Sequence, residues 1–238
     1  MFRTIKFYIK ALGAVIALVP LRFKAKLILR AKGRKAADEY IYKVVHWWAG
    51  GRVRDTGANV IVHNPENLPK DGNYLFVSNH QSNFDFAMLL DEIEIPVGFI
   101  AKIELKKLPI IKGWMDSIHC LFMDRSDMKQ QLKIILEGIE LLKSGHSLII
   151  FPEGTRSRDG KIQEFKAGSF KLATKSKVPI IPLTIIGAAD VLENNNYIIA
   201  PADVHLYVHK KIDVASLGKE ELSKLHSTVQ EIIEGPMK

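Results

Sequence analysis

The chain has 238 residues, which is long enough for one well-packed domain with a small appendage. Hydrophobic residues make up 47% of it and charged residues 25%, a balance that excludes wholesale disorder. The single cysteine, Cys120, cannot form an internal disulfide, so the composition gives no sign of an oxidising compartment.

The net charge of +8 is concentrated in the first part of the chain. Residues 1–54 hold thirteen Lys and Arg against only Asp38 and Glu39, a net charge of +11, so the remainder carries −3. Such asymmetry indicates a separate electrostatic role, with nucleic acid or anionic lipid as the binding partner.

Apolar residues in the same segment favour lipid over nucleic acid. Residues 11–21 contain no charge, but this run is shorter than the roughly 20 residues that a membrane-crossing helix needs. Two amphipathic patterns surround it, one over residues 2–16 and one over residues 37–48 that ends at Trp47 and Trp48. We therefore expect residues 1–55 to form a two-helix motif that lies in the membrane interface, with its basic side chains facing anionic lipid.

Two other interpretations of this segment are open. A cleaved signal peptide would use Arg3 and Lys6 as its basic region, but no small-x-small cleavage motif follows, and the basic run after Pro20 opposes export. The second interpretation is a pair of ordinary core helices, which seldom carry so many Lys and Arg.

From Asp55 onward, short apolar runs alternate with amphipathic stretches. We expect strands at residues 59–63, 74–78, 97–101, 118–123, 147–151, 178–187 and 204–210. Helices are expected at residues 84–90, 129–143, 170–175 and from 217 to the end. The alternation predicts an α/β domain over residues 56–238, with a central mixed β-sheet flanked by helices.

Two prolines mark the expected strand at 178–187. Pro179 and Pro182 surround an apolar pair, and proline removes a hydrogen-bond donor from a β-ladder. We therefore expect this strand to lie at a sheet edge or to carry a kink. Its role would be packing, as one wall of an acyl site.

The first candidate for chemistry is the pair His80 and Asp85. Five helical steps place two side chains about 140° apart, so the two meet only if His80 ends a strand and Asp85 lies in the first turn of the next helix. Asp85 would then accept from Nδ1–H of His80, which leaves Nε2 to take a proton from an alcohol. A substrate hydroxyl would itself be the nucleophile. The alternative is a strand-end histidine that caps the helix.

The second candidate is the loop after residues 147–151. Gly154 permits close backbone approach, Thr155 offers a hydroxyl, and Arg156 offers a planar fork suited to phosphate. Glu153 is expected to anchor the loop, because its charge would repel a phosphate. Further positive potential comes from Arg158, Lys161 and Lys166. An exposed turn with an arginine is the alternative.

Lys102 and Arg125 follow two other expected strands. Each side chain would reach an anionic substrate from there. Each would equally suit a surface ion pair, which contributes under about 1 kcal/mol.

Together these segments resemble the four ordered motifs of the glycerophospholipid acyltransferases. The matching segments span about 100 residues: Asn79-His80 with Asp85, Met123-Asp124-Arg125, Phe151 to Arg156, and Val178 to Pro182. The resemblance is greatest to the bacterial 1-acyl-sn-glycerol-3-phosphate acyltransferases and covers roughly residues 56–215.

The resemblance implies transfer of a fatty acyl group from acyl-CoA or acyl-carrier protein to the sn-2 hydroxyl of lysophosphatidic acid, which gives phosphatidic acid for phospholipid synthesis. His80 would be the general base and Asp85 would hold its imidazole. The substrate phosphate would be bound by Gly154, Thr155, Arg156 and Lys102, with Arg125, Glu153 and Pro182 as further candidates for substrate contact.

The resemblance implies no metal and no resident cofactor, and a place on the cytoplasmic face of a bacterial inner membrane. Three alternatives are kept. The first is an acyltransferase for another lyso-lipid acceptor, which competition by lysophosphatidic acid would separate. The second is a metal phosphohydrolase, whose activity would depend on a metal. The third is a non-catalytic lipid-binding module, which would bind membranes without turnover.

Overall fold

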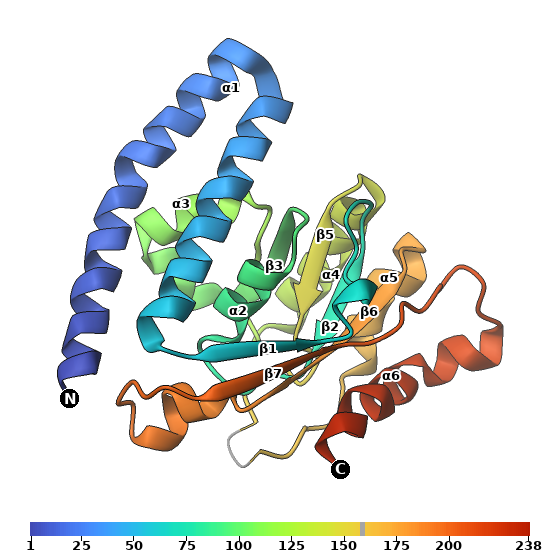
Figure 1. Cartoon of the computed structure of the whole chain (residues 1–238). Helices are drawn as coiled ribbons and strands as arrows, with labels where there is room; N and C mark the ends of the chain where they lie inside the picture. The colour runs from blue at the N-terminus through green and yellow to red at the C-terminus, as the bar shows by residue number, and fades with distance from the viewer. Residues whose placement is uncertain (158–159) are drawn as a thin grey trace.

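A seven-stranded β-sheet organises the computed structural model, which describes residues 1–157 and 160–238 (Figure 1). The strands are β1 (Asn59–His63), β2 (Leu75–Ser78), β3 (Val97–Lys102), β4 (Leu121–Met123), β5 (Ser147–Ile150), β6 (Ile180–Ile186) and β7 (Asp203–Val208). Their order is β1-β7-β6-β2-β5-β3-β4. The β6–β7 pair is antiparallel and the other neighbouring pairs are parallel, so the predicted mixed sheet is confirmed.

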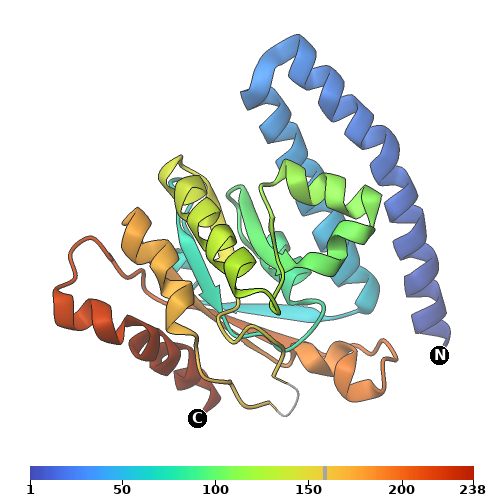
Figure 2. The ribbon, with the colours of Figure 1, turned by 180° about the vertical axis from the view of Figure 1, so that it is seen from behind.

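Helices cover both faces of the sheet. They are α1 (Phe2–Thr56), α2 (Asp85–Glu92), α3 (Pro109–Ser117), α4 (Met128–Lys143), α5 (Lys171–Ser176) and α6 (Lys219–Glu234). Phe76 of β2 packs with the core under α1 and α2, whereas its neighbours Leu75 and Val77 pack with the core under α4, α5 and α6. Figures 1 and 2 show the helices on the two sides of the sheet. Burial of one strand on both faces is typical of a parallel sheet between two helical layers.

The segment α1 consists of two helical arms that are joined at Gly33. Figure 1 shows that the two arms form a hairpin. Gly33 has φ 81° and ψ −178°, a backbone conformation that glycine adopts without steric cost, and the helical geometry breaks there. The arms meet again near the base, where Lys10 pairs with Asp55 at 2.6 Å. The predicted pair of helices is confirmed, but the first arm is longer than its amphipathic pattern, because helical geometry continues through Pro20.

Exposed apolar side chains follow one face of the first arm at intervals of three and four residues. They are Phe2, Ile5, Ile9, Leu12, Ile16, Val19, Phe23 and Leu27. Within the described residues, no helix combines the length and apolar character needed to cross a membrane.

One helix was missed and one strand boundary was wrong. The helix α3 was not predicted, and the strand β4 starts three residues later than expected. His119 explains the later start, because it has a positive φ of 58° and lies in the turn between α3 and β4.

Two alternatives were expected for the strand with Pro179 and Pro182, an edge position or a kink. The edge position is wrong, since β6 lies between β2 and β7. Pro182 O accepts from His209 N at 3.0 Å, so the missing N–H of this proline points away from β2. Pro179 precedes the strand, and its carbonyl accepts from Leu75 N at 3.0 Å. Neither proline therefore removes a donor from the β2–β6 ladder.

Candidate active site

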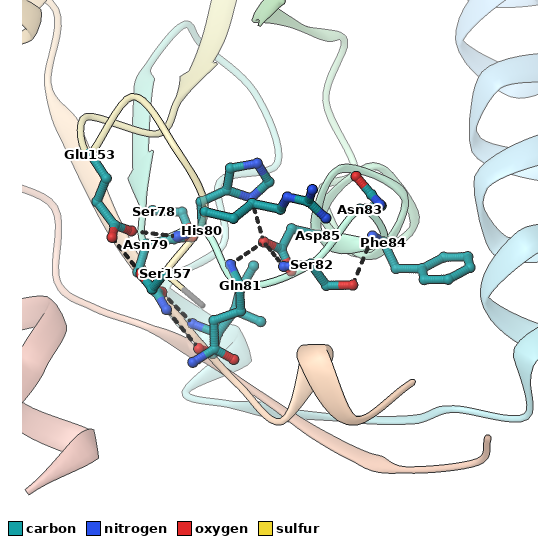
Figure 3. Close-up of polar contacts among 12 residues, drawn as sticks. Ser78, Asn79, His80, Gln81, Ser82, Asn83, Phe84, Asp85, Glu153 and Ser157 are labelled. Atoms are coloured by element: carbon teal, nitrogen blue, oxygen red, sulfur yellow. Dashed lines mark hydrogen bonds and ion pairs between the residues drawn. The ribbon is translucent and has the colours of Figure 1, made fainter. Parts of the chain in front are cut away.

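The candidate site lies where parallel strands end together. Strands β2, β5 and β3 run in the same direction, so their carboxyl ends lie side by side at the same end of the sheet. His80 lies just after β2, Phe151 just after β5, and Lys102 at the end of β3. Figure 3 shows the polar contacts around His80 at this end of the sheet.

Asn79 fixes the loop beyond the end of β2. Its Nδ2 donates to Ile185 O and its Oδ1 accepts from Ile185 N, both at 2.8 Å. The side-chain amide therefore continues the hydrogen bonding to β6 beyond the end of β2. Asn79 is fully buried. The sequence placed this residue in the motif but gave it no role.

His80 and Asp85 contact each other as predicted (Figure 3). Nδ1 of His80 lies 2.7 Å from Oδ2 of Asp85, and this oxygen also accepts from the backbone N–H groups of Gln81 and Ser82. Asp85 is the first residue of α2 and is fully buried. An ionised carboxylate only accepts, so a neutral imidazole paired with it through Nδ1 has its hydrogen on Nδ1 and a lone pair on Nε2.

The ring of Phe151 restricts the imidazole from one side. The two ring centroids lie 4.3 Å apart and the planes are inclined by 21°, a stacked arrangement. This contact was missed from the sequence. The only signal for it is an aromatic residue directly after the strand next to β2.

Glu153 anchors the second loop to the first. Its carboxylate accepts from His80 N at 2.7 Å, from Gln163 N at 2.9 Å and from the hydroxyl of Ser157. Burial raises the pKa of Glu153, and the hydrogen bonds from Gln163, Ser157 and His80 act in the opposite direction. The anchoring role is confirmed. The side chain is buried and both of its oxygens accept hydrogen bonds, and contact with substrate stays a prediction.

Gly154 lets a lysine side chain approach the loop. Its φ is 72°, and a Cβ at this position would lie 2.7 Å from Nζ of Lys166. A side chain at residue 154 would therefore displace the ammonium group. Thr155 beside it is exposed.

Arg156 has a carboxylate partner that the sequence did not indicate. Its Nη1 donates to Oε1 of Glu193 at 2.7 Å, and the two side chains are 27% and 15% exposed. Glu193 also binds the loop that follows His80, since it accepts from the hydroxyl of Ser82 at 2.7 Å and from Asn83 N at 2.9 Å. The predicted phosphate-binding arginine is thus held close to the histidine loop.

The sequence that forms this site matches a known family. The sequence model described as "Acyltransferase" matches residues 59–186, which is more than half of the chain. The chain belongs to the acyltransferase family. The resemblance seen in the four motifs is confirmed by this match, and His80 and Arg156 both lie inside the matched range.

Relatives of this acyltransferase-family chain carry consistent names. A probable 1-acyl-sn-glycerol-3-phosphate acyltransferase of Mycoplasma pneumoniae is 40% identical over 143 residues, which cover 58% of this chain and 53% of that protein. One of the same name from Mycoplasma genitalium is 30% identical over 205 residues, 81% of this chain and 74% of that protein. The chain therefore spans about half of the first relative and about three quarters of the second.

A solved structure extends the similarity to the whole acyltransferase-family chain. The crystal structure of the 1-acyl-sn-glycerophosphate (LPA) acyltransferase PlsC from Thermotoga maritima is 30% identical. The match has a TM-score of 0.87 and covers 99% of this chain and 93% of that one. It includes the N-terminal hairpin as well as the sheet.

The remaining predicted site residues lie in different places. Lys102 is exposed and pairs with Glu104 at 2.8 Å, which is the surface ion pair that the sequence allowed. Arg125 is exposed in the turn after β4. Pro182 pairs with Val77 inside the sheet, three residues before His80 along β2, so the prediction that it contacts substrate is not supported. Arg158 lies outside the described residues.

Proposed function

We propose that the chain transfers a fatty acyl group from acyl-CoA or acyl-carrier protein to the sn-2 hydroxyl of 1-acyl-sn-glycerol-3-phosphate and so makes phosphatidic acid. The observation that carries the proposal is the 2.7 Å contact between Nδ1 of His80 and Oδ2 of Asp85, in a loop that Glu193 links to Arg156. The names of the relatives support lysophosphatidic acid as the acceptor.

In the proposed reaction, the sn-2 hydroxyl gives its proton to Nε2 of His80 as its oxygen attacks the thioester carbonyl. Asp85 fixes the imidazole by its hydrogen bond to Nδ1, and its negative charge stabilises the imidazolium that forms. The tetrahedral intermediate then breaks its carbon–sulfur bond. The thiolate takes the proton back from the imidazolium and leaves as a thiol. The step needs neither a side-chain nucleophile nor a metal.

The phosphate of the acceptor is assigned to the loop that contains Arg156. The guanidinium supplies a planar set of donors that matches phosphate oxygens. Lys166 adds a second positive charge, because its ammonium lies against Gly154 in the same loop. Thr155 and Lys102 are kept as further donors, and Arg125 as a candidate at the neighbouring strand end.

The first helical arm is proposed to bind the membrane surface. Its apolar face is exposed, and the arm lies within the segment of residues 1–54, which carries a net charge of +11. Apolar burial and attraction to anionic lipid together hold a helix in the interface plane. We propose that the chain acts on the cytoplasmic face of a bacterial inner membrane, as a monotopic or peripheral protein.

Placing aspartate at both Ile9 and Ile16 is expected to lower binding to phosphatidylglycerol-containing vesicles by at least about tenfold, because each change removes the burial of one large apolar side chain. These side chains are 67% and 62% exposed, so the fold should tolerate the change. Vesicle co-sedimentation measures the effect. The matched control is aspartate at Leu132 and Leu136 of α4, which are each 55% exposed. Equal loss of binding in both variants would contradict the assignment of this face.

The acceptor is tested by thiol release from acyl-CoA with different lysolipids. Lysophosphatidic acid is expected to give a kcat/KM at least about 100-fold above that of 1-monoacylglycerol, which lacks the phosphate that the site would bind. Lysophosphatidylethanolamine tests the alternative acceptor class. If it outcompetes lysophosphatidic acid, the acceptor assignment is wrong and the acyltransfer chemistry remains.

Cys120 will not disturb a thiol assay on the folded protein. The side chain is buried, and burial raises the pKa of its thiol to about 12. Thiolate is the reactive form, so a thiol-reactive dye at pH 8 should report the released product alone.

A further inference from the structure

Glu193 lies outside all four motifs and yet joins two of their loops. It belongs to the short 3-10 turn Glu193–Asn195, which follows β6 in the chain. One carboxylate oxygen accepts from Arg156 and from the backbone of Asn83, and the other accepts from Ser82. The carboxylate is therefore fixed by three donors, two of them in the loop between His80 and Asp85.

This contact holds Arg156 by one edge of its guanidinium. A guanidinium has five N–H donors, and Glu193 receives a hydrogen bond from Nη1. The other donors remain for a second anion, because the group is planar and its donors point in several directions. The donors from Ser82 and Asn83 offset part of the carboxylate charge, which reduces its repulsion of a phosphate.

The same contact sets the position of Arg156 relative to the histidine. Oε1 of Glu193 bridges the guanidinium and Asn83 N, so the cation lies two hydrogen bonds from the backbone of the loop that carries His80. On the other side, Ser157 N donates to His80 O at 2.8 Å. A cavity of about 140 Å³ opens here, and its lining includes Gln81, Arg156, Ser157 and Glu193.

We propose that Glu193 is a positioning residue for the acceptor phosphate. It acts through Arg156, which it holds in place so that the remaining N–H groups meet a phosphate ester beside His80. This inference rests on the proposed function and adds to it the residue that places the phosphate-binding arginine. Glu193 touches neither the hydroxyl nor the thioester.

The test is steady-state kinetics of the full chain in detergent with lysophosphatidic acid and acyl-CoA. Glu193→Ala is expected to raise the KM for lysophosphatidic acid by about tenfold or more, the loss expected for one charge-assisted contact. The KM for acyl-CoA and kcat should stay within about threefold of wild type, since the reacting groups are untouched. Glu193→Gln keeps one acceptor oxygen and should show a smaller rise.

A double-variant cycle separates positioning from general damage. If Glu193 acts through Arg156, adding Glu193→Ala to Arg156→Ala should raise the KM for lysophosphatidic acid no further. The matched control is Glu66→Ala, an exposed carboxylate in the turn after β1 at the other edge of the sheet, which should keep wild-type kinetics.

Three results would overturn the inference. They are a KM for lysophosphatidic acid that is unchanged or lowered by Glu193→Ala, a loss confined to kcat, and an equal rise in the Arg156→Ala background. If Glu193→Ala does not fold, Glu193→Gln carries the same comparisons. A wild-type chain that never acylates lysophosphatidic acid removes the proposed function and this inference together. If the wild-type chain acylates lysophosphatidic acid and the Glu193 variants keep its KM for lysophosphatidic acid, only the inference about Glu193 is wrong.

Discussion

His80→Ala is expected to lower kcat for acyl transfer by about 10²–10⁴-fold, which is the contribution of a positioned general base. The KM for lysophosphatidic acid should change little, because the phosphate is assigned to the loop of Arg156. The fold should survive, since the contacts of His80 with Glu153 and Ser157 that anchor the loop come from its backbone N–H and carbonyl. Initial rates with saturating acyl-CoA measure the effect.

The matched control for this change is His146→Ala. His146 precedes β5, whereas His80 follows the parallel strand β2. The two histidines therefore lie at opposite ends of these strands. The same side-chain truncation there should leave kcat near that of wild type. If His80→Ala keeps more than about a tenth of the wild-type kcat, His80 is not the general base, since such a base contributes about 100-fold at least.

Asp85→Asn is expected to lower kcat by between about 10-fold and 1,000-fold, because an opposite charge at hydrogen-bond distance stabilises a cation by about one to three factors of ten. The amide oxygen can take the place of Oδ2 and keep the bonds from His80, Gln81 and Ser82. The amide nitrogen would then occupy the place of Oδ1, which is buried without a hydrogen-bond partner in the described structure. The variant therefore removes the charge and keeps the loop.

Two measurements on the Asp85 variant are needed. Thermal unfolding checks that the loop is preserved, and kcat reports the loss of charge. A folded variant with wild-type kcat would show that Asp85 only shapes the turn. Asp85→Ala is less informative, because it leaves the three donors without their acceptor and destabilises the loop itself.

The pairing of His80 with Asp85 was predictable because it is local. The two residues are five apart, and the change from strand to helix between them fixes their geometry. The exposed apolar face of the first arm was predictable for a similar reason, since helical spacing alone places Ile5, Ile9 and Ile16 together.

Contacts between distant segments were not predictable. Glu193 is 37 residues from Arg156 and 110 from Asn83, and a single glutamate in a short turn has no pattern that identifies its partners. The stacking of Phe151 on His80 depends on β5 lying next to β2, which the order of strands in the chain does not reveal.

The error at Pro182 has a definite physical cause. The prolines were taken to require an edge position or a kink, but what matters is the direction in which the proline nitrogen points. The nitrogen of Pro182 faces the segment near His209, and the carbonyl oxygen of Pro182 accepts a hydrogen bond from His209 N on that side. The ladder between β6 and β2 is therefore complete. Sequence alone specifies the missing donor and not the neighbour that it would have faced.

The most direct test of the account measures both products of one reaction. Wild-type chain, one defined acyl-CoA and lysophosphatidic acid are mixed in detergent, and free coenzyme A and phosphatidic acid are quantified by mass spectrometry. The account predicts one phosphatidic acid, with the new acyl group at sn-2, for each coenzyme A released, and neither product when one substrate is omitted. Thioester cleavage without phosphatidic acid, or vesicle binding with no product from any donor and acceptor, would contradict it.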